Sequence, residues 1–316
     1  SLVPFLKDAR LADPAARALS TINTAASKEA LLNALPEASG TAKLAIIEEL
    51  GNTAYQPAAK AIIPSANSED QSLKKVSLHA LAQIADASSE GVLAEAAAKA
   101  GYQYDNTEAT AAYLLYLKNQ YKKGAGAAVN KKAADLMKKL KAPEQIHTRI
   151  ALLKLQAYIA GSNSTGLLTA AMKDDQIAYR KAALQFAKPY LNETTAATWI
   201  NTIKKSTPAA KSEIINMLAS NGFTSAYAPA VQLLQSSDAA TRMSVMNAAA
   251  ISGKSAAIPA LLGIMKKADA AEATSVKNAL LLLDNKDVVP AIPGAISGAT
   301  NPGKAALLDV LGEKAA

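Results

Sequence analysis

Apolar residues recur at helical spacing along most of the chain, and no stretch alternates as a half-buried strand would. In residues 177–191 the apolar positions 177, 184, 187 and 191 lie on one face of a helix with 3.6 residues per turn. A shorter apolar run precedes many of these segments and often begins near a proline, which the first turn of a helix tolerates. The pattern predicts pairs of helices joined by a turn, with prolines at Pro57, Pro229, Pro259 and Pro290.

Basic residues open many of the longer runs at one constant spacing, which we call the repeat interval. They form two series: Lys43 and Lys74, then Arg149, Arg180, Lys211 and Arg242. Small or polar residues close the runs at a similar spacing: Asn23, Gly51, Asp86, Gly161, Asn192, Asn221, Gly253, Asp284 and Gly312. Such a period indicates stacked helix pairs. We expect an all-α fold, an α-solenoid of about nine helix-turn-helix repeats in a single domain that covers residues 1–316.

An aspartate stands four residues before some of these cations, as in Asp13 to Arg17 and Asp238 to Arg242. Together with the inter-helix proline and the closing Gly or Asp, this resembles the HEAT-repeat family, specifically its bacterial HEAT-like members. The resemblance implies a superhelix of helix pairs, and it implies no particular activity because such scaffolds serve many tasks.

The recurrence of the Asp-to-cation pair favours a structural role. An aspartate can cap a helix, and a cation one turn later can bridge to the next repeat. A catalytic residue would be needed once, not in every repeat. The alternative is a row of cations that binds an anionic partner. The expected structural ladder consists of Asp13, Arg17, Lys43, Lys74, Arg149, Arg180, Lys211, Asp238 and Arg242.

One repeat is irregular and lengthened, around residues 87–148. Arg149 follows Lys74 by clearly more than two repeat intervals, and we expect loops at 101–107 and 124–128. Tyrosine suits sugars, peptides and protein interfaces, although these tyrosines could instead fill gaps between helices while the lysines remain in water. The candidate binding residues are Tyr102, Tyr104, Tyr113, Tyr116, Tyr121, Lys122, Lys123, Lys131 and Lys132.

Composition excludes several kinds of chemistry. The absence of cysteine removes thiolate metal sites and a cysteine nucleophile. The two histidines, His79 and His147, are separated by about two repeats, so we expect no shared metal and no cofactor. Most of the net charge of +8 lies in residues 118–141, where eight lysines face one aspartate. Because a surface that follows phosphates should spread its basic residues, we do not expect nucleic-acid binding.

The sequence thus favours a non-catalytic interaction scaffold for a protein, peptide or glycan. Alternatives are a HEAT-like nucleic-acid-binding or DNA glycosylase-type enzyme and a regulatory protein that binds a small ligand. The alanine- and lysine-rich character also resembles the helical-repeat segment preceding a 3-keto-glycoside-hydrolase-like domain in secreted bacterial proteins. This implies an attached C-terminal domain that performs any catalysis, and a periplasmic or secreted location over a cytoplasmic one. No apolar stretch is expected to span a membrane, and further chain is expected after Ala316.

Overall fold

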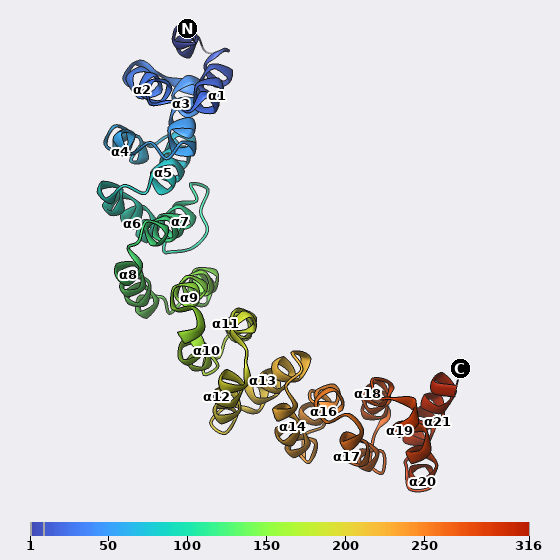
Figure 1. Ribbon diagram of the computed structural model, residues 1–316. Coiled ribbons are helices and arrows are strands. Elements are labelled where there is room, and N and C mark those ends of the chain that lie inside the picture. Colours follow the sequence, from blue (N-terminus) through green and yellow to red (C-terminus); the bar gives the residue numbers. More distant parts are fainter. Residues whose placement is uncertain (1, 9, 316) are drawn as a thin grey trace. The chain divides into compact units, whose positions relative to one another are not determined.

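The protein is built from helices alone wherever its structure is described. The computed structural model describes residues 2–8 and 10–315, and these contain α- and 3-10 helices but no strand (Figure 1). Its contacts divide the chain into two compact units, Ser1–Ala160 and Gly161–Ala316. The expectation of a single domain stays a prediction.

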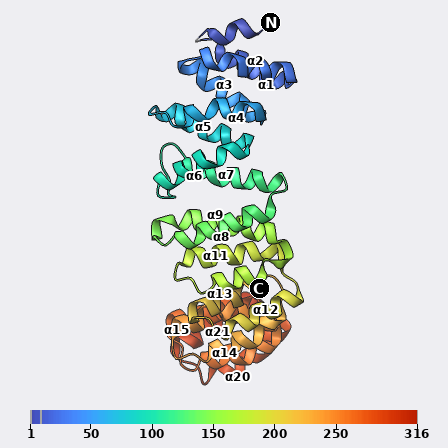
Figure 2. The same ribbon diagram turned by 90° about the vertical axis from the view of Figure 1, so that its left-hand side faces the viewer.

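The first unit stacks helix pairs, and the second helices of consecutive repeats pack on one another (Figures 1 and 2). A 3-10 helix, Val3–Lys7, and helix α1 (Ala12–Ile22) precede four complete pairs within the described residues. These pairs are α2 (Ala25–Ala34) with α3 (Gly40–Asn52), α4 (Ala59–Ala66) with α5 (Gln71–Ile84), α6 (Glu90–Lys99) with α7 (Ala109–Lys122), and α8 (Gly126–Lys139) with α9 (Ile146–Ala160).

The second unit repeats the plan with five pairs in the described part of the chain. In the third pair the second helix is divided, and short helices precede the last. The pairs are α10 (Thr165–Ala171) with α11 (Ile177–Ala187), α12 (Glu193–Ile203) with α13 (Pro208–Ser220), α14 (Tyr227–Leu234) with α15 (Ala239–Met243) and α16 (Met246–Gly253), α17 (Ile258–Ile264) with α18 (Ala270–Leu281), and α19 (Asn285–Val288) and α20 (Ile292–Ile296) with α21 (Asn301–Ala315). The predicted all-α solenoid of helix-turn-helix repeats is confirmed.

Local sequence signals fix many of the helix starts. Asp70 accepts hydrogen bonds from the backbone N–H groups of Ser72 and Leu73 at the start of α5, at 2.8 and 3.1 Å. Thr207 caps α13 in the same way, and Pro208 follows it in the first turn, where a missing N–H costs nothing. The prolines predicted at helix starts lie in first turns of α-helices or of the 3-10 helices that lead into them: Pro57, Pro229, Pro259 and Pro290.

The core consists mainly of alanine, leucine and isoleucine, as the composition predicts. Trp199 is 1% exposed and packs inside the second unit. Gly51 permits a close approach between helices, because a Cβ at this position would lie 2.7 Å from the Ala80 Cα. Small residues therefore allow α3 and α5 to pack closely, with Ile46, Ile47, Leu50, Leu78 and Leu81 buried around them.

Three sequence expectations need correction at the level of single residues. Gly51 and Gly312 lie inside α3 and α21, so they do not close those helices. Ile177 was expected on the buried face of its helix but is 56% exposed, because α11 begins at this residue and leaves its side chain in water. The loop expected at 124–128 is shorter, since α8 already begins at Gly126.

The lengthened segment contains two ordinary helix pairs and one long loop. Residues 100–108 connect α6 to α7, and Gly101, Tyr102 and Glu108 adopt positive φ there. Thr148 donates to the Tyr102 carbonyl at 2.7 Å, and Lys75 forms an ion pair with Glu108 at 2.6 Å. The additional residues therefore form a loop that is fixed to the helices on either side.

One stretch is more apolar than the sequence analysis expected. An 18-residue window within residues 239–264 reaches a mean hydropathy of 1.2, which by length and composition alone would suit a membrane span. Half of that window is buried inside the protein. The stretch also comprises separate helices, since α16 starts after Val245 and the backbone changes direction at Lys254, where φ is 48°. Val245, Met246, Leu261 and Ile264 are buried in the repeat core, whereas Ile251 is 43% exposed.

Candidate interaction site

The tyrosines of the candidate segment divide between the core and the surface. Tyr113 and Tyr116 are 8% and 1% exposed, and their rings stack with centroids 6.4 Å apart. Burial raises the pKa of each hydroxyl to about 12. Both side chains fill space between helices, the packing role that the sequence left open for them. Tyr102 and Tyr121 are half-buried, and only Tyr104, at 84%, is largely exposed.

Most lysines of the same segment are engaged by polar groups of their own helix or of a neighbouring repeat. Lys132 forms an ion pair with Glu90 at 2.5 Å, and Lys131 forms one with Asp135 at 2.9 Å. Lys123 donates to the carbonyls at the end of α5. Lys122 is exposed and makes no side-chain hydrogen bond within the described chain. The structure does not bring these lysines and the tyrosines together into one surface, and their role in binding stays a prediction.

The cations of the periodic series fall into two groups. Lys43, Lys74 and Lys211 are half-buried and form no ion pair or side-chain hydrogen bond among the described residues. Arg149 is half-buried in the first turn of α9. Arg17 pairs with Asp13 at 3.1 Å on the exposed side of α1, a contact within one helix. Arg180 and Arg242 are buried, and each forms an ion pair with the following repeat.

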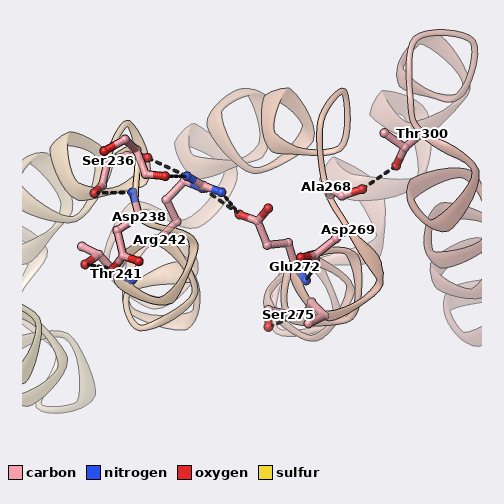
Figure 3. A network of polar contacts seen from close by, with 11 residues as sticks. Ser236, Asp238, Thr241, Arg242, Ala268, Asp269, Glu272, Ser275 and Thr300 are labelled. Atoms are coloured by element: carbon pink, nitrogen blue, oxygen red, sulfur yellow. Dashed lines mark hydrogen bonds and ion pairs between the residues drawn. The ribbon is translucent and has the colours of Figure 1, made fainter.

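Arg242 joins its own inter-helix loop to the next repeat (Figure 3). One guanidinium edge donates to the Ser236 and Ser237 carbonyls at 2.7 and 2.9 Å, and Nε donates to a Glu272 carboxylate oxygen at 2.6 Å. Arg242 and Glu272 are 7% and 3% exposed. Asp238 caps α15 through Thr241, and these hydrogen bonds lower the pKa of the Asp238 carboxyl.

Arg180 repeats this arrangement two repeats earlier. It donates to the Asp174 and Asp175 carbonyls at 2.9 and 3.1 Å, and both its Nε and a terminal nitrogen contact Glu213 at 2.8 Å. The hydrogen bond to Glu213 raises the pKa of the Arg180 guanidinium. We call these two arrangements, Arg180 with Glu213 and Arg242 with Glu272, the arginine clips. They fix α11 relative to α13 and α15 relative to α18.

A groove of about 450 Å³ crosses the second helices of three consecutive repeats, α11, α13 and α16. Lys181 and Lys188 line it at α11, and the Glu213 that belongs to the first arginine clip lies beside them. Leu184 and Met217 form apolar parts of its floor, together with Ala219 and Ala248. No sequence motif marks this groove, because its members are single residues on three helices.

The described part of the chain shows no assembled metal site. No cluster of three or more His, Cys, Asp or Glu side chains that could hold a metal ion occurs there. His79 and His147 are both exposed, one on α5 and the other on α9. The geometry of the second unit instead offers an open surface on helices that the arginine clips hold together.

Stacked helix pairs joined by contacts between neighbours define an α-solenoid. The family comparison is more specific for one part of the chain, since residues 196–281 match the family model for HEAT repeats. A search of curated protein sequences gives no match.

Solved structures with a similar fold include two of the karyopherin Kap121p. In the complex with Nup53p, the Kap121p sequence is 12% identical to this chain and the TM-score is 0.58. The match includes 98% of this chain and 40% of the Kap121p chain. The complex with the extreme C-terminus of the protein phosphatase Cdc14p is 13% identical with a TM-score of 0.57, at 98% and 41% coverage. This chain therefore spans about two fifths of the length of the Kap121p chains. At such low sequence identity the similarity concerns the fold alone.

Proposed function

We propose that the protein is a non-catalytic interaction scaffold that binds a protein partner in the groove across α11, α13 and α16. The observation that carries this proposal is the position of the groove on α11 and α13, which the clip of Arg180 and Glu213 joins, and on α16 of the next repeat. The clip of Arg180 holds α11 against α13 beneath the groove. A surface whose backbone is already ordered loses less entropy on binding, so more of the contact energy appears as affinity.

Two further observations support a protein or peptide over a small molecule. The groove is open along three repeats and combines apolar floor residues with charged edges, whereas small-molecule sites enclose most of their ligand. Karyopherin Kap121p, which has a similar fold, is seen in complexes with Nup53p and with a terminus of Cdc14p. A glycan is the alternative occupant of the groove. A bound glycan would give no protein adduct in the crosslinking experiment described next.

Site-specific photocrosslinking tests the proposal. A photoreactive amino acid replaces Ser220, an exposed residue at the edge of the groove, in the full chain inside the cells that produce it. The matched control carries the same group at Asn201, an exposed residue of α12 outside the groove. We expect one discrete protein adduct from position 220 and none from position 201. Equal labelling at both positions, or no adduct at 220, would contradict the proposal.

We also propose that the chain is one module of a larger secreted bacterial protein connected with carbohydrate processing. The alanine- and lysine-rich, cysteine-free composition supports this context. Cell fractionation with an antibody to the chain, together with the sequence downstream of its gene, provides the test. A periplasmic or secreted protein with a further C-terminal domain is expected, and a cytoplasmic protein without one would contradict the assignment.

A further inference from the structure

The second helices of the second unit carry a side-chain amide at one equivalent position. Gln185, Asn216, Asn247 and Asn278 lie on α11, α13, α16 and α18, each exactly one repeat interval after the one before. The first three line the groove described above. We call these four residues the amide row. Their common register places one amide on each of four neighbouring helices (Figure 1).

Most of these amides have unused hydrogen-bonding capacity. Gln185, Asn247 and Asn278 are exposed and make no side-chain hydrogen bond among the described residues. Asn216 donates from Nδ2 to the Ser244 carbonyl at 2.7 Å, which leaves its oxygen as an acceptor. The row thus presents both donors and acceptors to whatever enters the groove, and within the described chain three of its four members have no competing partner.

A side-chain amide matches the hydrogen-bonding groups of a peptide main chain. Its NH₂ can donate to a carbonyl while its oxygen accepts from an N–H group. Packed helices lie about 8–10 Å apart, and an extended chain rises about 3.3 Å per residue. About three residues of an extended peptide would therefore pass from one amide to the next, so the spacing of the row fits a strand-like main chain laid across the helices.

The two ends of the row differ in chemistry. At α11 the groove carries Lys181 and Lys188, whose positive charge has no partner among the described groove residues because the nearby Glu213 is already paired with Arg180. Toward α18 the residues one turn after the amides are aliphatic and exposed: Ile251 at 43% and Leu282 at 55%. Charge complementarity therefore favours acidic side chains at one end and apolar side chains at the other.

The next position of the series, Asp309 on α21, ends the row. It is a carboxylate, and it contacts Lys277 at 3.4 Å, while Lys277 also pairs with Glu313 at 2.9 Å. The position of Asp309 therefore provides neither a side-chain amide nor an unpaired charge, and the row ends at Asn278. Four consecutive repeats define the length of the surface, which corresponds to roughly ten residues of extended peptide at about three residues per repeat.

We propose that the amide row binds an extended peptide segment of the partner protein through its main chain, with acidic residues over α11 and aliphatic residues over α16 and α18. This rests on the proposed function and narrows its partner to a linear segment with an acidic and an aliphatic half. Specificity comes from the two ends, whereas the amides supply contacts that tolerate many sequences, as main-chain recognition does in other peptide-binding folds.

The test uses the full chain and a randomised library of 12-residue peptides. Peptides selected on the wild-type protein are synthesised with a fluorophore, and their Kd values are measured for two double variants. Gln185→Ala with Asn247→Ala removes one glutamine and one asparagine of the row. Gln232→Ala with Asn201→Ala removes the same pair of residue types from exposed positions of α14 and α12. A third variant, Lys181→Glu with Lys188→Glu, reverses the charge at α11.

We expect selection of peptides with an acidic half and an aliphatic half, and about a tenfold or greater loss of affinity in the row variant with less than a twofold change in the control. The charge-reversed protein should select basic residues where the wild type selects acidic ones. Peptides that bind equally well to the row variant, or that lack the acidic half, would overturn this inference while leaving the proposed function intact. Enrichment of no peptide would also overturn it, and the crosslinking at position 220 then decides the proposed function independently.

Discussion

The second unit joins repeats by buried arginine clips, whereas a lysine that donates to the carbonyls at the end of an earlier helix occurs in both units, as Lys123 in the first and Lys314 in the second. In the first unit, α7 reaches the end of α5: Lys123 donates to the Ile84 and Ala85 carbonyls at 2.7 and 3.0 Å, and Asn119 donates to the Ala82 carbonyl at 3.0 Å. Lys123 itself is exposed, whereas Ala82, Ile84 and Ala85, which supply the carbonyls, are buried. In the second unit, the arginine clips connect the starts of second helices and are buried.

The difference shows what a basic residue at a repeated position can and cannot do. An arginine has a planar fork that serves loop carbonyls on one edge and a carboxylate on the other, whereas a lysine ammonium lacks this geometry. A carboxylate must also be present about one repeat later, as Glu213 and Glu272 are. Lys211 has the sequence position but neither the fork nor an acidic partner, and it joins nothing within the described chain.

Loss of Arg242 should be the most damaging change. Arg242→Ala leaves Glu272, 3% exposed, as a buried charge without its partner, and we expect a loss of about 3–5 kcal/mol in the free energy of unfolding. Trp199 is the only tryptophan and lies in the second unit, so its fluorescence during urea unfolding reports on that unit.

The matched control is Lys211→Ala, which should change the stability by less than about 0.5 kcal/mol. Arg242→Met with Glu272→Met removes both charges and should recover most of the loss, because buried ion pairs are often replaceable by apolar residues. Similar losses for Arg242→Ala and Lys211→Ala would show that the clip does not distinguish the two positions.

Alkaline pH should weaken the first unit through its buried tyrosines. Burial raises the pKa of Tyr113 and Tyr116 from an ordinary value of 10 to about 12. The unfolded chain ionises first, so stability that is fully present below pH 10 is lost as pH rises from 10 toward 12, by on the order of 2–3 kcal/mol for each tyrosine.

Phenolate absorbance checks this expectation, because two of the ten tyrosines should remain un-ionised until about pH 12 or until the unit unfolds. Tyr113→Phe with Tyr116→Phe keeps the packing volume and should remove this part of the pH dependence. A wild-type titration in which every tyrosine ionises near pH 10 without unfolding would contradict the buried placement.

Loss of Lys123 should have the smallest effect of the three. Lys123→Met removes the two hydrogen bonds to the end of α5, but it leaves neutral carbonyls and no buried charge without a partner, so we expect a loss of about 1 kcal/mol. The control is Lys122→Met, the neighbouring exposed lysine without a described partner, for which no measurable change is expected. If Lys123→Met lowered the free energy of unfolding as much as Arg242→Ala, the lysine contact and the arginine clip would not differ in strength, contrary to this prediction.

Most of the fold was predictable because its signals are local and periodic. The constant repeat interval, the proline-led first helices and the caps at Asp70 and Asp238 each act within one repeat or between neighbours. The role of Gly253 was hidden, because its cause lies in another helix: a Cβ there would approach the Tyr227 ring to 2.3 Å. The sequence marks the glycine but not the ring packed against it.

The candidate site was less predictable for a related reason. A cluster of tyrosines and lysines attracts attention, yet Tyr113 and Tyr116 face the core and Lys132 faces Glu90. The groove residues are ordinary side chains that become neighbours only when α11, α13 and α16 stack. Burial is decided by that stacking, so residue type alone does not reveal which face of a helix meets water.

The arginine clips also restrict which repeat can follow which in the second unit. A repeat that contributes Arg180 must be followed by one that offers a carboxylate at the place of Glu213. If residues 208–238 were deleted, α12 would lead directly into the helix that begins at Ala239, and Ser244 would take the place of Glu213. The arginine would then be buried without this counterion, so the repeats of this region have a fixed order and cannot be exchanged or omitted freely.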